Sequence, residues 1–448
     1  MLNNTVGYPM KLDKMGDWRR SHYSAYIGPE LDGQEVLVFG WVHEIRDLGG
    51  LRFVILQDKT GQLQLTIHRN KVPVEVVEKA GSLQKQYSIG VKGIVKKIGK
   101  APRGVEIIPN ELRIFNVAEQ PLPLDITGRT KAEIDVRLDS RVLDLRREEN
   151  QAIFLIQHAA LKAIRNFLSQ QGFMEIFTPR IIVSATEGGS ALFPVAYFTR
   201  EAFLAQSPQL YKEQLILDFE KVFEIGPFFR AEESHTRRHL SEFISVDIEQ
   251  AFATAEDVMK VLEGLILNVC KTVADTCSRE LELLNHQINV PDLPFSRLTY
   301  SEVLHELESE KIHINWGEDI PTIAYRTLGK LHPYYYFITD WPTKTKAFYI
   351  QPKDANPELS EGFDLMWHWV ELSSGGTRIH SKELLMKRLS EQGLNAVSFK
   401  THLQTFDFGM PPHAGWGLGL ARLIMVLTGV KNIREVVLFP RDQMRLTP

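Results

Sequence analysis

Between residues 35 and 115 the chain alternates apolar and polar positions in short runs, a pattern typical of strands with one buried face. The runs span residues 35–46, 51–58, 62–68, 88–98 and 105–115, and glycine-containing turn signals separate them at 48–50, 59–61 and 99–104. A short helical pattern at 74–80 falls between the third and fourth runs. Five strands with a helix in that place predict an OB barrel, a fold that commonly presents a sheet face and loops to single-stranded nucleic acid.

The pattern changes after residue 120, where Pro121, Pro123 and Gly128 are followed by alternating charges, as in a hinge between domains. The next segment, 151–170, has apolar residues at helical spacing, and Gly172 ends it. Strands and helices then alternate without regular spacing, which predicts an α+β domain around a mostly antiparallel sheet. Segment 258–284 reads as helical, and 295–329 reads as an inserted lobe whose fold the pattern does not define.

These patterns predict four parts: an N-terminal extension at 1–20, the barrel at 21–118, the hinge at 119–147 and a large domain at 148–448. A chain of 448 residues is too long for one ordinary core, so more than one domain is expected.

Composition limits the function classes. The net charge of −4 excludes a general nucleic-acid coat protein, because non-specific affinity for phosphate needs clustered positive charge. Any contact with nucleic acid must therefore be local. One candidate is a group of five cations, although a solvated strand edge explains it equally well. The group consists of Lys92, Lys96, Lys97, Lys100 and Arg103.

Neither a signal peptide nor a membrane segment is expected, because no apolar run reaches about 18 residues. Cys270 and Cys277 are the only cysteines, which fits a reducing cytoplasm, and we expect both to be inert.

An arginine interrupts the apolar strand pattern at 222–230. Arg230 is costly there unless it pairs with an anion, and its planar guanidinium suits a phosphate or a carboxylate. An internal ion pair with Glu232 or Glu233 would also explain it.

Two further segments combine glycines with charged residues. Segment 361–378 ends in Glu371, two serines, two glycines and Arg378, which could supply a metal ligand and an anion clamp beside an accessible backbone. Segment 415–425 has glycine at 415, 417 and 419 as it enters an apolar helix that contains Arg422. Glycine costs roughly 1 kcal/mol in a helix, so three of them indicate a close approach by another group. A turn of small residues and tight helix–sheet packing would need no ligand.

Taken together and in this order, the three segments resemble motifs 2 and 3 of the class II aminoacyl-tRNA synthetases, with the aspartate family's Glu-Leu-Ser-Ser-Gly-Gly-x-Arg between them. Motif 1 resembles 172–179, which ends in Pro179, and the stretches 186–190, 203–212 and 432–441 extend the likeness. It covers residues 21–448 and is strongest to archaeal-type aspartyl-tRNA synthetases. It implies a five-stranded OB-fold barrel that binds the anticodon, followed by a catalytic domain on an antiparallel sheet flanked by helices, and a homodimer formed through motif 1.

The resemblance also implies residue roles. Residues similar to the family's catalytic set are Arg230, Glu371 and Arg422. Residues similar to its ATP site are Arg230, Ala231, Glu232, Arg238, His239, Leu240, Glu371, Gly419, Leu420, Ala421 and Arg422. Residues similar to its aspartate site are Glu187, Gln209, Leu210, Tyr211, Lys212, Arg230, Ser374 and Arg378, with Asp247 and Glu249 as further members. Glu371 and Ser374 look like the magnesium site, and oxygen ligands suit that ion.

The chemistry agrees with these roles. Forming an aminoacyl adenylate joins a carboxylate to the α-phosphate of ATP, so the site must supply positive charge and orientation. No P-loop run is present. Lys212 and Arg378 match the family's cations for the aspartate side chain, and two cations facing an amide would lack a counter-charge. Ala421 departs from the pattern, because many relatives have glutamate before the motif 3 arginine.

Two alternatives remain. An asparaginyl-tRNA synthetase shares the run at 236–243, but Lys212 has no useful partner on a carboxamide. A non-catalytic RNA-binding paralogue would be expected to lose Arg230, Glu371 or Arg422, and all three are present.

Two barrel residues concern the choice of tRNA. Relatives that accept only tRNA(Asp) tend to have tryptophan at the position of His43 and lysine at that of Pro102, whereas relaxed relatives tend to have histidine and proline, as here. Proline has no side-chain donor and histidine leaves more room, so the third anticodon base would be sensed less strictly. The resemblance therefore implies a non-discriminating enzyme that also aspartylates tRNA(Asn). The other interpretation is that His43 faces solvent and Pro102 only forms a turn.

Overall fold

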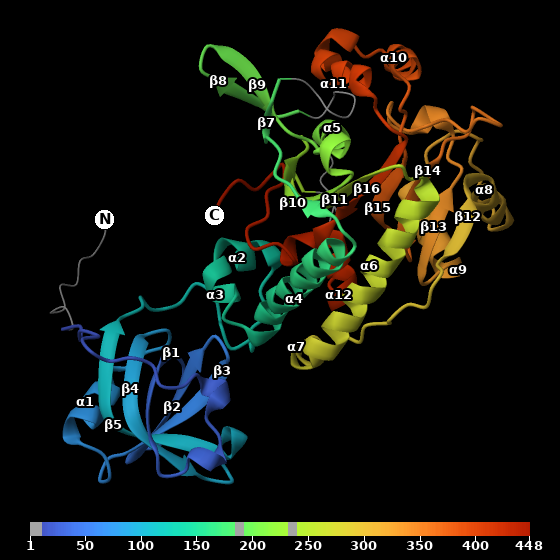
Figure 1. Ribbon diagram of the computed structural model, residues 1–448. Coiled ribbons are helices and arrows are strands. Elements are labelled where there is room, and N and C mark those ends of the chain that lie inside the picture. Colours follow the sequence, from blue (N-terminus) through green and yellow to red (C-terminus); the bar gives the residue numbers. More distant parts are fainter. Residues whose placement is uncertain (1–10, 184–191, 232–239) are drawn as a thin grey trace. The chain divides into compact units, whose positions relative to one another are not determined.

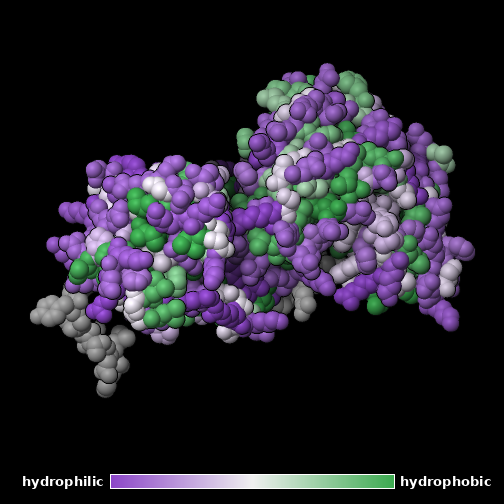
Figure 2. Space-filling model, turned by 90° about the horizontal axis from the view of Figure 1, so that it is seen from below, coloured by the Kyte–Doolittle hydropathy of each residue, from purple (hydrophilic) through white to green (hydrophobic). Residues whose placement is uncertain are grey.

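The chain divides into two compact units, Met1–Glu148 and Glu149–Pro448, in a computed structural model that describes residues 11–183, 192–231 and 240–448 (Figure 1). Hydrophilic side chains predominate on the face seen in Figure 2, and hydrophobic ones form patches between them. Among the described helices, none combines the length and the apolar character that a membrane crossing requires.

The first unit contains a closed barrel of five strands in the order β1-β2-β3-β5-β4. Its elements are η1 (Ser24–Tyr26), η2 (Pro29–Leu31), β1 (Glu35–Asp47), β2 (Leu51–Asp58), β3 (Gly61–His68), α1 (Val74–Ser82), β4 (Ser88–Lys97), η3 (Pro102–Gly104) and β5 (Val105–Asn116). Buried positions alternate along β1, which reflects the period-two pattern of the sequence. Gly93 is required at the closure of the barrel, because a Cβ there would lie 2.4 Å from the carbonyl oxygen of Ile108. The predicted five-stranded barrel with one helix is confirmed.

The segments that flank the barrel belong to the same unit. The described part of the N-terminal segment packs on it: Asp13 accepts a hydrogen bond from Lys79 Nζ at 2.7 Å, and the Arg113 guanidinium lies 3.9 Å from the centre of the Trp18 ring. Helices α2 (Ile134–Asp139) and α3 (Arg141–Asp144) follow β5 in the segment predicted as a hinge.

Among the described residues, the second unit has an eight-stranded sheet in the order β12-β13-β14-β15-β16-β11-β10-β6. The six strands from β13 to β10 pair antiparallel with one another, and β12 and β6 join the two edges in parallel, so the sheet is mixed. The strand bounds are β6 (Met174–Glu175), β10 (Lys221–Phe229), β11 (Glu242–Ala251), β12 (Ser296–Thr299), β13 (Tyr335–Thr339), β14 (Gly362–Trp367), β15 (Val370–Thr377) and β16 (His413–Gly419). The predicted α+β class with a mostly antiparallel sheet is confirmed.

Helices pack against this sheet around the main apolar core. The core includes side chains of α4, α6 and α12 together with the central strands. Helices α4 and α6 lie close together, because a Cβ on Gly264 of α6 would lie 2.9 Å from the ring of Phe167 on α4. The helix bounds are α4 (Glu148–Gln170), α5 (Gln209–Phe219), α6 (Ala255–Thr276), α7 (Ser278–Leu283), α8 (Tyr300–Ser309), α9 (Thr322–Leu331), η4 (Thr343–Thr345), α10 (Lys382–Glu391), η5 (Ala396–Phe399), α11 (Lys400–Thr405), η6 (Phe406–Phe408), α12 (Leu420–Thr428) and η7 (Ile433–Glu435).

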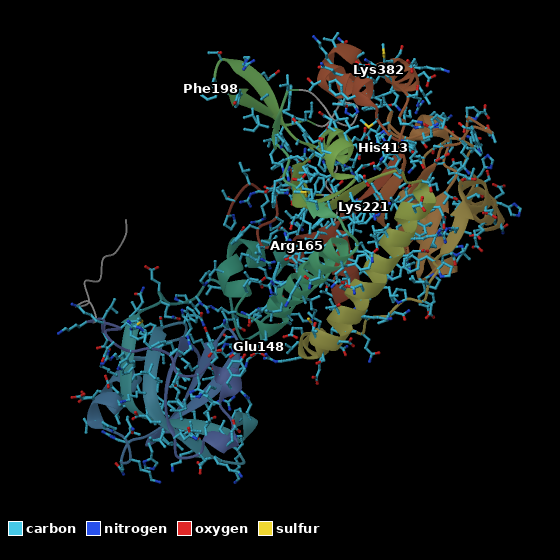
Figure 3. All side chains as sticks on the ribbon, viewed as in Figure 1. Glu148, Arg165, Phe198, Lys221, Lys382 and His413 are labelled. Atoms are coloured by element: carbon cyan, nitrogen blue, oxygen red, sulfur yellow. The ribbon has the colours of Figure 1, made fainter. Side chains whose placement is uncertain are left out.

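A smaller sheet has the order β7-β9-β8, with β7 (Ile181–Ile182), β8 (Pro194–Tyr197) and β9 (Arg200–Leu204). Phe198 lies at the tip of the β8–β9 hairpin and is 91% exposed (Figure 3).

Two parts of the second unit differ from the sequence expectation. The helix expected at 258–284 breaks at Cys277, which separates α6 from α7. The segment 295–329 is not a detached lobe: β12 joins the main sheet, and α8 and α9 pack with β13 around a small core that contains Tyr300. Both cysteines are buried and unpaired, and burial raises the pKa of Cys270 to about 11, which agrees with an inert thiol.

Candidate active site

A cavity of about 510 Å³ lies in the second unit over strands β11, β15 and β16. Strand β16 lies between the other two, so Gly417 is opposite Asp247 on β11 and Ser374 on β15, and Gly415 is opposite Glu249. Side chains at paired positions point to the same face of a sheet. The glycines of β16 therefore leave room for the polar side chains of its neighbours.

The three glycines of 415–419 lie in a strand, whereas the sequence interpretation placed them at the entry to a helix. They lie in β16, and helix α12 begins after them. A Cβ on Gly415 would lie 2.3 Å from Glu249 Oε2, and a Cβ on Gly417 would lie 3.0 Å from Asp247 Oδ1. The expected close approach is present at Gly415 and Gly417, where the approaching groups are acidic side chains of the next strand, whereas Gly419 has only the Arg422 side chain near it, at 3.7 Å or more.

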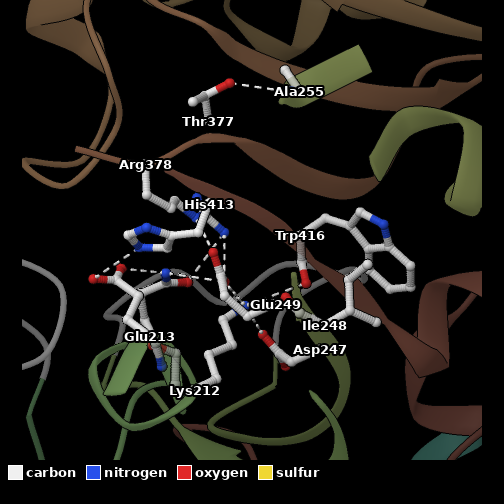
Figure 4. A network of polar contacts seen from close by, with 12 residues as sticks. Lys212, Glu213, Asp247, Ile248, Glu249, Ala255, Thr377, Arg378, His413 and Trp416 are labelled. Carbon is white, nitrogen blue, oxygen red and sulfur yellow. Dashed lines mark hydrogen bonds and ion pairs between the residues drawn. The ribbon is translucent and has the colours of Figure 1, made fainter. Parts of the chain in front are cut away.

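Lys212 stands on α5 within this acidic group and is 2% exposed (Figure 4). Its ammonium lies 3.2 Å from Asp247 Oδ1 and 3.3 Å from Glu249 Oε2. It also donates to the carbonyl oxygens of Ile248 at 3.1 Å and Trp416 at 3.4 Å. The ammonium is therefore surrounded by acceptors of the chain itself.

Arg378 follows β15 and is also 2% exposed, although it lines the cavity. Its Nε donates to Glu249 Oε1 at 3.0 Å, and its Nη2 donates to Gln209 Oε1 at 3.3 Å and to Glu249 Oε2 at 3.4 Å. Burial opposes the charge, but the Glu249 carboxylate outweighs it and raises the pKa of the guanidinium. Lys212 and Arg378 thus share Glu249 as a common partner.

Arg230 lies one residue beyond β10 and lines another part of the cavity. Its backbone N–H donates to the carbonyl of Ser241 at 2.9 Å, and its guanidinium lies 5.2 Å from the centre of the Phe243 ring. Stacking on a ring fixes the plane of a guanidinium. Leu240, across the gap in the described chain, lines the cavity as well.

Glu371 and Arg422 form a second charged group at the cavity. Arg422 Nη1 donates to the backbone carbonyl of Glu371 at 2.8 Å and lies 3.7 Å from Glu371 Oε1. The Glu371 side chain is 45% exposed because it faces the open cavity. The surrounding protein atoms still raise the pKa of its carboxyl group, and the Asp364 carboxylate adds to the rise, whereas Arg422, Lys346 and Arg230 lower it.

Asp364 and Lys346 complete this group, and the sequence interpretation did not single them out. Lys346 Nζ lies 2.8 Å from Asp364 Oδ1 and 2.7 Å from Oδ2, and Asp364 pairs with Ser374 in the register of β14 and β15. Within the described ranges, no three His, Cys, Asp or Glu side chains form a metal-binding group. Asp364, Glu371 and Ser374 instead offer two carboxylates and a hydroxyl, a mixed set of hard oxygen donors that fits magnesium.

The structure brings most of the predicted site residues together. Those that line the cavity are Gln209, Arg230, Leu240, Glu371, Ser374, Arg378, Gly419, Ala421 and Arg422. Those that lie beside it without lining it are Leu210, Tyr211, Lys212, Ala231 and Leu420. Those that fall outside the described residues are Glu187, Glu232, Arg238 and His239.

Further lining residues were given no role from the sequence, although two of them belong to the stretch 203–212. They include Gln206, Ser207, Ser245, Lys346 and Tyr349. Ser245 could have been found, because it is two positions before Asp247 and strand alternation puts both on one face.

In the first unit, His43 and Pro102 occupy different settings. His43 sits at a register shift in β1, is 9% exposed, and contacts Gln57 Oε1 through Nδ1 at 3.1 Å, and its burial lowers its pKa. It does not face solvent. Pro102 is exposed in the turn between β4 and β5. Pro102 and His43 therefore lie toward different ends of β1. The turn that contains Pro102 is near the start of β1, because Glu35 pairs with Ile94 close to the end of β4. His43 comes two residues after Trp41, which pairs with Ser88, the first residue of β4.

Comparison with known proteins identifies the two units. The family described as tRNA synthetases class II (D, K and N) matches residues 133–443, and the family described as OB-fold nucleic acid binding domain matches residues 36–115.

Relatives match over nearly the whole chain. The Aspartate--tRNA(Asp/Asn) ligase of Methanothermobacter thermautotrophicus is 51% identical and covers 97% of this chain and 100% of its own. That of Methanopyrus kandleri is 52% identical over 95% and 99%. The crystal structure of asparaginyl-tRNA synthetase from Pyrococcus horikoshii complexed with asparaginyl-adenylate superposes with a TM-score of 0.90 at 32% identity, covering 96% of this chain and 100% of that one. The resemblance drawn from the motifs is confirmed, and the chain belongs to the class II tRNA synthetases of the D, K and N family.

Proposed function

We propose that this chain activates L-aspartate with ATP and transfers it to tRNA(Asp) and also to tRNA(Asn). The observation that carries the proposal is the identity of 51% and 52% to two Aspartate--tRNA(Asp/Asn) ligases over at least 95% of the chain. The cations at the cavity support it independently, because both substrates of the first step are anions. ATP and tRNA as substrates, together with two unpaired cysteines, support a cytoplasmic location.

In the first step, the aspartate α-carboxylate attacks the α-phosphate of ATP, the bond from the α-phosphorus to the oxygen bridging to the β-phosphate breaks, and pyrophosphate leaves with the electron pair, which gives aspartyl adenylate. Arg230, stacked on Phe243 at the cavity, is suited to hold these two anions together. Arg422 would hold the terminal phosphate. Residues proposed to complete the ATP site are Ala231, Glu232, Arg238, His239, Leu240, Gly419, Leu420 and Ala421.

The side-chain carboxylate of aspartate would bind where Arg378 lines the cavity. Lys212 lies behind it and shares Glu249 with it, so both cations contribute positive charge to this end of the cavity. Gln209 and Ser374 line the same cavity and would contact the bound amino acid. Residues proposed to complete the pocket are Glu187, Leu210 and Tyr211.

Magnesium would be held by Glu371 and Ser374, and Asp364 joins them by its register opposite Ser374. When bound, the ion would supply charge neutralisation for the phosphates of ATP. Lys346 is paired with Asp364 in the structure, so it already balances one of these carboxylates.

Aspartate-dependent exchange of pyrophosphate into ATP tests the proposal. We expect exchange with aspartate and none above background with asparagine, because a carboxylate offers the Arg378 guanidinium two acceptors, whereas a carboxamide offers one acceptor and turns N–H donors toward a group that only donates. Equal exchange with asparagine would favour an asparaginyl-tRNA synthetase. No exchange with either amino acid would favour a non-catalytic RNA-binding protein.

Charging both transcripts side by side tests the choice of tRNA. We expect comparable aspartylation of tRNA(Asp) and tRNA(Asn). A separate amidotransferase would then amidate the aspartyl-tRNA(Asn). A preference above about a hundredfold for tRNA(Asp), near 2.7 kcal/mol, would contradict it.

The two barrel positions should act separately, because they lie toward different ends of β1. Pro102→Lys is expected to lower charging of tRNA(Asn) relative to tRNA(Asp) without a loss of stability, since Pro102 is exposed. His43→Trp should add to the preference, but at a cost in stability, because it removes the contact with Gln57. Neither change should alter pyrophosphate exchange. Pro73→Lys, at another exposed proline of the barrel unit, is the control.

A homodimer is expected, because the segment around Pro179 exposes several large apolar side chains. They are Met174 at 50%, Phe177 at 80%, Ile181 at 48% and Val183 at 87%. Burying them against a second copy would remove them from water. Light scattering at micromolar concentration should give twice 51.2 kDa, and Phe177→Asp should shift it toward the monomer. Phe252→Asp, at an apolar side chain that is 72% exposed, should not. A fully active monomer would refute the dimer.

A further inference from the structure

Three ionisable side chains gather behind the cavity, outside its lining. Glu213 on α5 is fully buried. His402 Nε2 on α11 lies 3.1 Å from Glu213 Oε2, and His413 Nε2 at the start of β16 lies 3.8 Å from the same oxygen (Figure 4). A buried carboxylate needs partners of this kind, because isolated charges are strongly disfavoured away from water. None of the three residues has a part in the proposed chemistry.

The geometry around His413 fixes the tautomer of its ring. The carbonyl of Pro411 lies 2.8 Å from His413 Nδ1 and can only accept, so Nδ1 carries the hydrogen. Its Nε2 is the ring nitrogen on the side of Glu213. Burial would raise the pKa of Glu213, but the two histidines beside it outweigh the burial and hold that pKa well below its usual range. Glu213 is therefore kept as an anion.

An anionic Glu213 determines how the Gln209 side chain is turned. Gln209 Nε2 donates to Glu213 Oε1 at 2.5 Å, and this places Gln209 Oε1 where it accepts from Arg378 Nη2 at 3.3 Å. A carboxylate only accepts hydrogen bonds, so a flipped Gln209 amide would set two oxygens against each other. Gln209 Nε2 also donates to Glu249 Oε2 at 3.4 Å, but the contact with Glu213 is the shorter of the two, so Glu213 makes the larger contribution to the orientation of Gln209.

Arg378 is held from two sides by this arrangement. Gln209 and Glu249 take its Nε and Nη2 donors, and its backbone N–H donates to the His413 carbonyl at 2.8 Å. For Nη1, the described part of the chain provides no hydrogen-bond partner. Because Arg378 lines the cavity, Nη1 is the donor available to a bound anion.

The balance of charge agrees. The connected network contains two permanent cations, Lys212 and Arg378, and three carboxylates. Two cations leave one of the three carboxylates without a counter-charge, and His402 and His413 lie beside Glu213. The histidines are therefore part of the electrostatic construction of the site.

We propose that Glu213, held by His402 and His413, is a positioning residue that fixes Gln209 and, through it, the Arg378 guanidinium that receives the amino-acid carboxylate. The inference rests on the proposed function, because the ligand of Arg378 is the side chain of aspartate.

Glu213→Gln tests it, because the shape is kept while the charge and the acceptor-only character are lost. We expect the KM for aspartate to rise about tenfold, the lower end of what a hydrogen bond to a charged group contributes. The kcat and the KM for ATP should stay within about twofold, because Arg230 and Arg422 are untouched. His402→Gln keeps a donor toward Glu213 and should raise the aspartate KM less. Glu310→Gln and His305→Gln, both exposed on or beside α8, are the matched controls.

Thermal unfolding shows whether each variant is folded. If Glu213→Gln is not folded, the KM for aspartate of His402→Ala and His402→Gln tests the inference instead, and His402→Ala should have the higher value. An unchanged aspartate KM in a folded variant overturns the inference. A fall in kcat and a rise in the KM for ATP as large as the rise in the KM for aspartate also overturns it, because such a result indicates general damage to the site. Wild-type protein that shows no aspartate-dependent exchange overturns the proposed function itself, which separates the two failures.

Discussion

Replacing Lys212 with leucine is expected to destabilise the second unit by about 3–5 kcal/mol and to lower the use of aspartate more than tenfold. Lys212 is 2% exposed and lies within 3.3 Å of both Asp247 and Glu249. Leucine would leave these buried carboxylates with Arg378 as their remaining cation in this group. The Arg378 guanidinium would then interact more strongly with these carboxylates, and less of its charge would be available to bind the carboxylate of aspartate. Urea unfolding and pyrophosphate exchange over a range of aspartate concentrations measure the two effects.

The exchange rate must be expressed per folded molecule, so that lost stability is not counted as lost activity. Lys260→Leu is the control, because its side chain is 64% exposed and lies 3.8 Å from Glu256 on the surface of α6. Surface changes of that kind usually alter stability by less than about 0.5 kcal/mol. If Lys212→Leu behaves like Lys260→Leu in both measurements, Lys212 has neither role.

The barrel could be predicted almost to the residue because its information is local. Alternating burial and glycine turns mark each strand, and β2 and α1 begin at the predicted residues, Leu51 and Val74. The helix α4 was equally clear from its apolar spacing.

Two features of the second unit could not be predicted from the sequence, the break after α6 and the pairing of β12. The apolar period continues across Cys277, so the break between α6 and α7 leaves no local signal. Strand β12 has only four residues, and its partner β13 lies 40 positions further on, as the pair Ser296 and Tyr336 shows. No periodicity within 295–329 indicates that pairing.

In the site, too, residues within motifs could be predicted from the sequence, and residues brought in by long-range contacts could not. Arg230, Glu371, Arg378 and Arg422 were found because each belongs to a long motif, and they line one cavity. Gln209 and Glu249, which hold Arg378, were also named from the sequence, but other residues that set the geometry of the site were missed.

Lys346 is a single charged residue outside the motifs, and Asp364 lies within segment 361–378 but was passed over for Glu371 and Arg378. The Glu213 cluster joins α5 to α11 and β16, which follow it by about 190–200 residues, and only the fold brings them together.

Replacing Arg422 with alanine is expected to slow adenylate formation by about 10²–10³-fold, the cost of losing one preorganised charge in a site of this kind. Many relatives have a glutamate before this arginine, whereas this chain has Ala421. The guanidinium is anchored differently: Nη1 donates to the Glu371 carbonyl at 2.8 Å, and Glu371 Oε1 lies 3.7 Å away. A backbone carbonyl stays in place when other side chains move, so the missing glutamate need not disturb Arg422.

Arg422→Lys separates charge from geometry. Lysine keeps the charge but not the planar fork, so its rate should fall between those of the alanine variant and the native protein. Both variants are expected to lose some stability, because the Arg422 side chain is only 26% exposed and donates to the Glu371 carbonyl, so the rate is expressed per folded molecule. Single-turnover formation of aspartyl adenylate at saturating ATP measures the effect, with Arg326→Ala, an exposed arginine of α9, as the control. An alanine variant that keeps the native rate would show that the terminal phosphate is held elsewhere. The anchor at Glu371 would then serve only the packing of α12 against β15.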